Sequence, residues 1–222
     1  MKTLIKSALF AMLLVFATAC AQNDKEENNE EVVESASEST TSAVLNANLA
    51  TEDELAAIGL PVDVVSGILE NRPFLSFNAF SDLLGVDMAT EEMFSKIFVP
   101  MNLNTTPEAD FKVIPGVGDR MAHEFEEYRP YSSIAQFRTE IGKYVDEEEV
   151  ARYEQYVFVP VELNSASEET MKALPGVGDR MAHEFDEYRP YSNMAQFRTE
   201  IGKYVDDKEL ERLARLVYIA EN

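Results

Sequence analysis

One short stretch of the sequence, which occurs twice, has residue types suited to binding an anion. It reads Pro-Gly-Val-Gly-Asp-Arg at residues 115–120 and again at residues 175–180. Each copy follows a short helical pattern and opens a longer one. A glycine on either side of the valine lets the backbone adopt positive φ and expose consecutive N–H groups. These groups lie where the positive end of the next helix dipole gathers, so the pattern predicts a small phosphate site.

The second copy and its surroundings resemble the helix-hairpin-helix DNA-binding motif. The resemblance rests on the run from Leu174 to Ala182 and on Tyr188-Arg189-Pro190. The most similar version is that of competence DNA-receptor (ComEA-like) proteins, whose upstream Asn-x-Ala-Ser-x-Glu-Glu-Leu phrase is echoed at residues 163–169. The resemblance covers residues 101–222 well and residues 46–100 weakly.

This resemblance implies that the hairpin amides hold a DNA phosphate without reading bases, assisted by a basic residue early in the second helix. By motif position, the phosphate-binding residues are Gly116, Val117, Gly118, Arg120, Gly176, Val177, Gly178 and Arg180. The basic residues that could converge with them are Lys112, Lys143, Lys172 and Lys203. Asp119, inside the motif, would repel a phosphate unless it caps the helix.

The chain repeats with a period near 60 residues from residue 45 onwards. Residues 115–146 and 175–206 are identical at 29 of 32 positions. The earlier repeat diverges, because it reads Gly59-Leu60-Pro61 in place of Gly-Val-Gly and proline has no N–H. We therefore expect three tandem units at residues 45–100, 101–160 and 161–222. We call the first of them the divergent unit, and we expect it to keep the scaffold but not the anion site.

Each unit is predicted to contain four short helices in two pseudo-symmetric hairpins, the arrangement of a paired helix-hairpin-helix domain. No segment alternates as a strand. The expected fold class is all-α: tandem paired helix-hairpin-helix (SAM-like) units behind a disordered N-terminal tether. In the second unit, cap and proline signals place the helices at about 107–113, 119–128, 134–140 and 147–157.

The first 20 residues are typical of a targeting segment. Lys2 and Lys6 precede an apolar run too short to span a bilayer, and Cys20, the only cysteine, follows three small residues. This pattern resembles a bacterial lipoprotein signal, which implies lipidation of Cys20. Because Ala17 stands where leucine is usual, a plain secretory signal stays open. Residues 21–44 are acidic with almost no large apolar side chains, which predicts a disordered tether.

The formal net charge of −22 opposes DNA binding, because phosphate contacts supply much of the non-specific affinity for DNA. Residues 21–100 hold sixteen acidic and three basic residues, residues 101–160 twelve and six, and residues 161–222 thirteen and eight. A net-negative domain can still bind where its basic groups collect on one face. The prediction is weak, salt-sensitive and sequence-independent DNA binding.

Metal binding and catalysis have little support in the residue pattern. A zinc helix reads His-Glu-x-x-His, but Glu127 takes the last position after His123, and the other histidine is His183. Carboxylate pairs such as Glu126-Glu127 are typical of solvated helix faces, and no unit is large enough to add a catalytic pocket beside its core. We expect a non-enzyme that uses no metal and no cofactor.

Two functional hypotheses follow. The first is an envelope-anchored protein, on the outer membrane or the exported face of a membrane, that binds DNA at its Gly-Val-Gly hairpins; the resemblance implies a role in DNA uptake. The alternative is a non-catalytic scaffold that binds envelope proteins, of the type II secretion-like kind, without DNA binding. The alternative explains the glycines, the repeats and the charge, but it leaves Arg120 and Arg180 unexplained.

Overall fold

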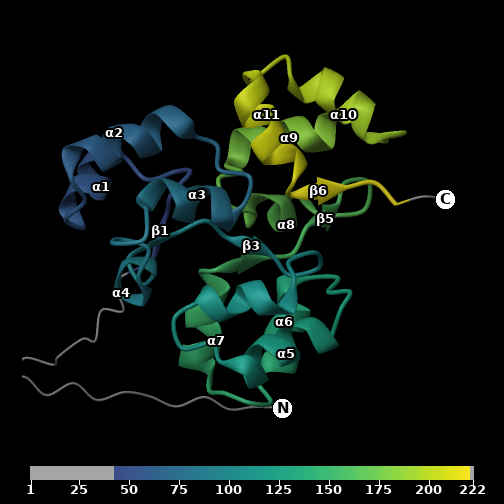
Figure 1. Ribbon diagram of the computed structural model, residues 1–222. Coiled ribbons are helices and arrows are strands. Elements are labelled where there is room, and N and C mark those ends of the chain that lie inside the picture. Colours follow the sequence, from purple (N-terminus) through teal and green to yellow (C-terminus); the bar gives the residue numbers. More distant parts are fainter. Residues whose placement is uncertain (1–42, 221–222) are drawn as a thin grey trace, which may run out of the picture. The chain divides into compact units, whose positions relative to one another are not determined.

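The chain is mostly helical in the part that the structure describes, residues 43–220, as the sequence predicts (Figure 1). The structure is a computed structural model. The predicted signal peptide, Cys20 and residues 21–42 of the predicted tether lie outside the described residues. Within residues 43–220, no helix has the length and apolar character needed to cross a membrane.

The same order of elements occurs three times, with a short strand at each end and helices between. The divergent unit contains β1 (Leu45–Asn46), α1 (Glu52–Ala57), α2 (Val62–Asn71), α3 (Phe77–Leu84), α4 (Glu91–Phe94) and β2 (Ile97–Phe98). The second unit contains β3 (Met101–Asn102), the 3-10 helix η1 (Glu108–Val113), α5 (Asp119–Glu127), α6 (Ile134–Ile141), α7 (Glu147–Glu154) and β4 (Val157–Phe158). The third contains β5 (Val161–Glu162), α8 (Glu168–Lys172), α9 (Asp179–Glu187), α10 (Met194–Ile201), α11 (Asp207–Ala214) and β6 (Val217–Tyr218).

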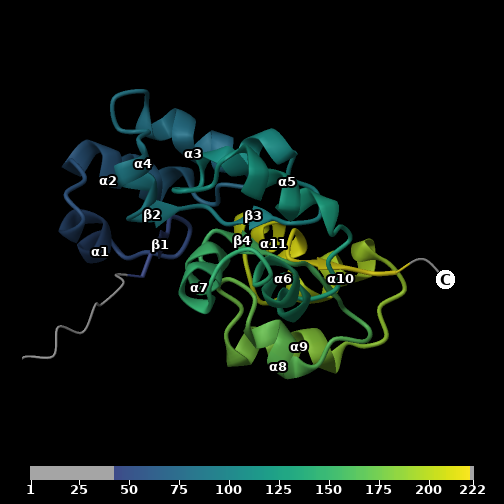
Figure 2. The same cartoon turned by 90° about the horizontal axis from the view of Figure 1, so that it is seen from below.

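The described residues contain six two-residue strands, although no segment of the sequence alternates as a strand. The first and last strands of each unit pair in parallel, with Leu45 opposite Ile97, Met101 opposite Val157 and Val161 opposite Val217. Figure 2 shows β1 beside β2 and β3 beside β4. Two residues are too few to show an alternating pattern in the sequence, which is why they were missed. The pairing joins the two ends of each unit.

The helices begin close to their predicted positions, and most begin at a side-chain cap. The side chain of Ser133, for example, accepts the N–H of Gln136 at the start of α6. Among the described α-helices, only α2, α5 and α9 begin without such a cap. These are the helices that follow Gly59-Leu60-Pro61 and the two Gly-Val-Gly stretches. In two places the expectation was wrong: η1 is a 3-10 helix, and α7 ends before the strand β4.

The core consists of aromatic and aliphatic side chains from the helices and short strands of each unit. In the second unit Phe125 is fully buried, and its ring packs edge-on against Phe111, Phe137 and Tyr153 at 5.1–5.4 Å between centroids.

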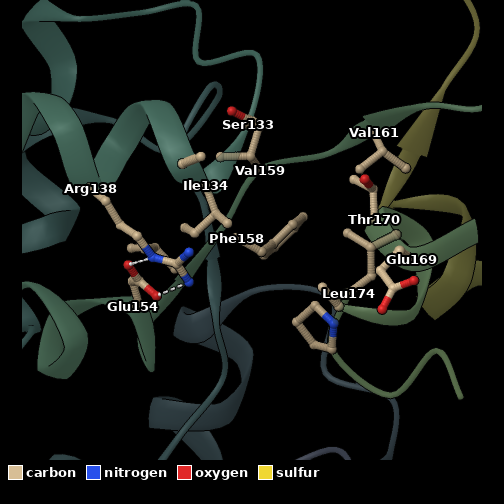
Figure 3. A pocket seen from close by; sticks show the side chains of 14 residues that line it. Ser133, Ile134, Arg138, Glu154, Phe158, Val159, Val161, Glu169, Thr170 and Leu174 are labelled. Carbon is tan, nitrogen blue, oxygen red and sulfur yellow. Dashed lines mark hydrogen bonds and ion pairs between the residues drawn. The ribbon is translucent and has the colours of Figure 1, made fainter. Parts of the chain in front are cut away.

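Beside Phe158 lies a hollow of about 420 Å³ (Figure 3). The bidentate ion pair of Arg138 with Glu154 at its rim satisfies both charges, at 2.5 and 2.8 Å.

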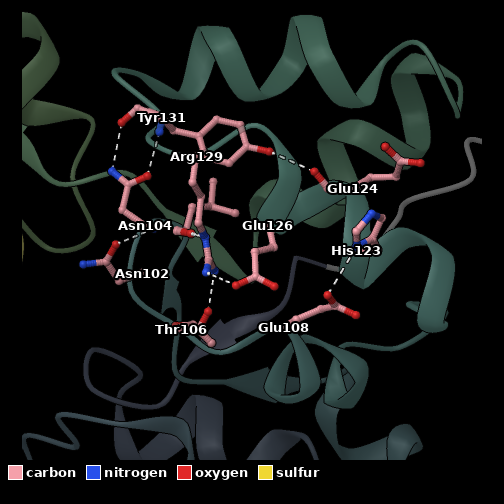
Figure 4. Close-up of polar contacts among 10 residues, drawn as sticks. Asn102, Asn104, Thr106, Glu108, His123, Glu124, Glu126, Arg129 and Tyr131 are labelled. Carbon is pink, nitrogen blue, oxygen red and sulfur yellow. Dashed lines mark hydrogen bonds and ion pairs between the residues drawn. The ribbon is translucent and has the colours of Figure 1, made fainter.

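An asparagine and an Arg-Pro pair hold the start of each unit against its middle. In the second unit the Asn104 side-chain amide donates to the Tyr131 carbonyl at 2.9 Å and accepts the Tyr131 N–H at 2.7 Å (Figure 4). The Arg129 guanidinium donates to the carbonyls of Leu103 and Thr106. The peptide bond that follows this arginine, and its counterparts in the other two units, is cis.

We call this set of hydrogen bonds the clamp. The divergent unit builds it from Asn48 with Phe74 and from Arg72, which donates to two carbonyls at 2.6 Å. The third unit builds it from Asn164 with Tyr191, together with Arg189.

Substitution of Asn104 by alanine is expected to lower the free energy of unfolding by about 2–3 kcal/mol, because two partly buried backbone groups lose their partners. Chemical denaturation monitored by circular dichroism measures the change. The control is Asn78→Ala on the exposed face of α3, which should change stability by less than about 0.5 kcal/mol. Equal losses of stability in the two variants would contradict the stabilising role of the clamp.

Candidate functional site

The first glycine turn (residues 115–120) and the second glycine turn (residues 175–180) each bend at their first glycine only. Gly116 has φ of 75° and Gly176 has φ of 69°. Gly118 has φ of −90° and ψ of −179°, which is ordinary extended backbone, and Gly178 is alike. The prediction of positive φ is therefore confirmed at the first glycine of each turn and wrong at the second.

The valine amides are not available to a ligand, contrary to the expected run of exposed N–H groups. The Val117 N–H donates to the Ile114 carbonyl at 2.9 Å, and the Val177 N–H donates to the Leu174 carbonyl at 3.0 Å. Both valine side chains are buried. The valines close the turns and anchor them to the core, so they drop out of the phosphate-binding set.

The N–H groups that stay available lie at the starts of α5 and α9. The first N–H of α5 to find a partner within the helix is that of Ala122, which donates to the Gly118 carbonyl at 3.0 Å. No side chain of the described part of the chain caps the helix, and Gly118, Asp119 and Arg120 are exposed. The same holds at α9. Uncapped N–H groups at the positive end of a helix dipole attract an anion.

The second glycine of each turn has no steric role toward the rest of residues 43–220. A Cβ atom added at Gly118 or Gly178 would meet none of their atoms within 4 Å. A Cβ at Gly116, by contrast, would lie 2.9 Å from Nη2 of Arg152. Gly118 and Gly178 thus leave bare, open backbone at the helix start, where an external group can approach closely.

Two arginines stand apart from the other basic residues. Of the sixteen lysines and arginines in residues 43–220, only Arg120 and Arg180 make neither an ion pair nor a hydrogen bond to another described residue. Arg120 lies over the Tyr144 ring at 5.5 Å, and Arg180 lies over the Tyr204 ring at 5.9 Å. Each is the second residue of an uncapped helix, so its charge is free to meet an anion there.

The predicted supporting lysines are all engaged with carboxylates. Lys112 pairs with Asp119, and this contact raises the pKa of Lys112 and lowers that of Asp119. Asp119 therefore does not cap α5, and its charge is offset by the lysine. Lys172 bridges Glu168 and Asp179 at 3.1 and 3.2 Å.

The other two lysines lie in the turns that follow α6 and α10. Lys143 pairs with Glu140 and lies 4.9 Å from the Tyr128 ring, whose hydroxyl is hydrogen-bonded to that of Tyr144 at 2.7 Å. Arg120 and Lys143 thus flank one tyrosine pair. Lys203 repeats the arrangement with Glu200 and Tyr188.

Two further arginines position the glycine turns and were missed in the sequence. Arg212 on α11 is only 3% exposed, donates to the carbonyls of Pro175 and Gly176 at 2.6 and 3.0 Å, and pairs with Glu209. Arg152 on α7 pairs with Glu149 and lies against Gly116. The available signal was their 60-residue spacing, which matches the repeat.

Parts of the divergent unit touch both glycine turns. The Gly116 N–H donates to Oε1 of Glu91 at 3.2 Å, so one turn amide is occupied by a carboxylate. A hollow of about 490 Å³ at the first turn is lined by residues that include Glu91, Lys112 and Gly118. At the second turn, Cδ2 of Leu49 lies 2.6 Å from the position that a Cβ of Gly176 would take.

The divergent unit keeps the bend but not the charges of the other units. Gly59 has φ of 87°, as the bend requires. At the four positions that carry the candidate site in the second unit, it has Ala56 for Lys112, Pro61 for Gly118, Asp63 for Arg120 and Val86 for Lys143. Its hairpin therefore offers an anion neither a glycine at the helix start nor a basic side chain.

Metal ligands do not gather in the described residues: within 43–220, no three His, Cys, Asp or Glu side chains lie close enough to share an ion. His123 instead contacts Glu108 through Nδ1 at 3.3 Å (Figure 4). No family model, curated protein or solved structure matches the chain.

The contact with Glu108 raises the pKa of His123 above its ordinary 6.5. The ion pair therefore stabilises the fold below about pH 6.5, and this contribution is lost as the pH rises through the higher folded-state pKa. NMR titration should place the His123 midpoint above 6.5, and Glu108→Gln should lower it. Glu168→Gln, the same change in the third unit, should leave it unchanged; a shift with both variants would contradict the assignment.

Replacement of Gly116 by alanine is expected to destabilise the protein by at least 1–2 kcal/mol, since the left-handed region disfavours any Cβ by roughly that amount. Gly118→Ala should change stability by less than about 0.5 kcal/mol, because a poorer helix cap is offset by a stiffer unfolded chain. Thermal unfolding of the two variants measures the difference in their stabilities. Equal losses of stability in Gly116→Ala and Gly118→Ala would contradict this prediction.

Proposed function

We propose that the chain is a DNA-binding protein built of tandem helix-hairpin-helix units, which holds DNA phosphates at the first and second glycine turns without reading sequence. The observation that carries the proposal is the pair Arg120 and Arg180. Each is an unpaired guanidinium on the first turn of an uncapped helix, among described basic side chains that are otherwise all engaged.

The chemistry of this pair suits a phosphate diester. A guanidinium stays charged at every physiological pH, and its planar N–H groups match the spacing of phosphate oxygens. The backbone N–H groups at the start of each helix add uncharged donors that point along the helix axis. One phosphate can meet both kinds of donor when it approaches the open backbone at Gly118 or Gly178.

The arrangement gives no means of reading bases, because the donors converge on the helix start rather than along a groove. With two turns that each neutralise one or two phosphates, the logarithm of the affinity should fall with the logarithm of salt at a slope of about −2 to −4. The acidic surface makes this binding weak. We place this DNA binding at the cell envelope, with the protein anchored to a membrane through a lipid on Cys20; the N-terminal sequence and the family resemblance support this part of the proposal.

A second candidate function has one observation in its favour. The divergent unit exposes Val62 by 82% and Val86 by 91%. These positions follow its own hairpins, where the second unit carries Asp119 and Lys143. Exposed apolar groups on an acidic unit suit a protein partner, so an envelope scaffold is the alternative. It gives no role to the two unpaired arginines.

Reversal of both charges in Arg120→Glu/Arg180→Glu should weaken binding to a DNA duplex of about 20 base pairs more than 10-fold at about 20 mM salt. The reason is that each glycine turn loses a cation and gains a carboxylate that repels phosphate. Fluorescence anisotropy of labelled duplex measures the affinity. The matched control is Arg138→Glu/Arg198→Glu, the same charge change at positions that pair with carboxylates in the same two units.

Equal losses in the two double variants would mean that only the net charge matters. Absence of binding by the unmodified protein at this low salt would refute DNA binding and leave the scaffold.

A further inference from the structure

The hydrogen bond between Glu91 and Gly116 joins the divergent unit, which lacks the candidate anion site, to the second unit, which carries one. Glu91 is the first residue of α4 in the divergent unit, and its Oε1 accepts the Gly116 N–H of the first glycine turn at 3.2 Å. The adjacent Glu92 turns instead to Lys96 at 2.8 Å. An acidic residue at a helix start stabilises that helix. This explains why Glu91 and Glu92 lie at the start of α4, but it does not explain why the Glu91 side chain contacts another unit.

The second glycine turn meets the divergent unit through an apolar side chain rather than a charge. Leu49 lies against Gly176, whereas no carboxylate of the divergent unit forms a hydrogen bond with this turn among the described residues. The third unit holds the divergent unit by Arg215, which donates to the carbonyls of Phe74 and Pro100 at 3.3 and 3.0 Å. Leucine cannot compete with an anion for N–H groups.

We infer that Glu91 is a built-in competitor for phosphate, which occupies the first glycine turn until a DNA phosphate displaces it. The inference rests on the proposed function and makes the two turns unequal. The second turn binds DNA phosphate first, and the first turn binds once Glu91 withdraws. A carboxylate is suited to this role because, like a phosphate, it is an anion with oxygens that accept N–H groups.

Charge and position agree with this account. Glu91 has no basic side chain as an ion-pair partner among the described residues, so its withdrawal breaks only the bond to Gly116. Glu91 also lines the hollow that contains Gly118 and Lys112, which is the space an approaching phosphate enters. A carboxylate there repels a second anion even when its hydrogen bond is broken.

The test compares Glu91→Gln with Glu92→Gln, which removes the same charge one residue further along. We expect Glu91→Gln to tighten duplex DNA binding by about 3–10-fold and Glu92→Gln by less than about 2-fold, because only the first neutralises a charge at the turn. The gain should vanish in Glu91→Gln/Arg120→Glu and persist in Glu91→Gln/Arg180→Glu.

NMR titration with inorganic phosphate provides a readout without DNA. In the unmodified protein the amide signals of the second glycine turn should respond at lower phosphate than that of Gly116, and Glu91→Gln should remove this difference. Equal effects of the two glutamine variants, or equal responses of both turns in the unmodified protein, overturn the inference. If phosphate shifts the amides as expected but duplex DNA is not bound, Glu91 still competes with phosphate at the first glycine turn, and it is the proposed function that fails.

Discussion

Each unit depends on two hydrogen bonds between one asparagine side chain and the backbone of a residue 26 or 27 positions further on. In the second unit this contact joins Asn104, just after β3, to Tyr131, just before α6. Arg129 adds donors to the carbonyls of the same turn after β3. Because η1 and α5 lie between the clamped points, the clamp fixes the loop that connects them. That loop is the first glycine turn.

The division of work among the residues of a turn follows from this fixed frame. Gly116 makes the bend, Val117 closes it and enters the core, and Gly118 leaves the helix start open. Arg152 supports the bend from α7. Arg120 makes no ion pair or hydrogen bond with any of the residues 43–220, and its guanidinium lies over the Tyr144 ring. A protein that needed only a tight turn would use the first two of these residues and could fill the third position with any side chain.

Much of this could be predicted from the sequence, because the signals are local. Repeated glycines, caps and prolines placed the helices within a few residues of their observed bounds. The strands could not be predicted, because a two-residue strand has no period and forms only through a partner about 55 residues away. The ion pair of Lys112 with Asp119 and the contact of Glu91 with Gly116 depend on three-dimensional proximity that spacing does not encode. The sequence therefore singled out the two arginines that have no ion pair or hydrogen bond among the described residues, but it did not show that the lysines and the valine N–H groups are already engaged.

The high negative charge of the chain gives the two unpaired arginines their significance. Most basic side chains of the described residues pair with carboxylates and a few donate to backbone carbonyls instead, so two arginines that do neither are conspicuous. The most direct test of the account is to map backbone amide shifts by NMR when short duplex DNA is added to the purified protein. The account predicts the largest shifts at residues 118–120 and 178–180, reversed by salt. Shifts confined to the exposed valines of the divergent unit, or no shifts at low salt, would contradict it.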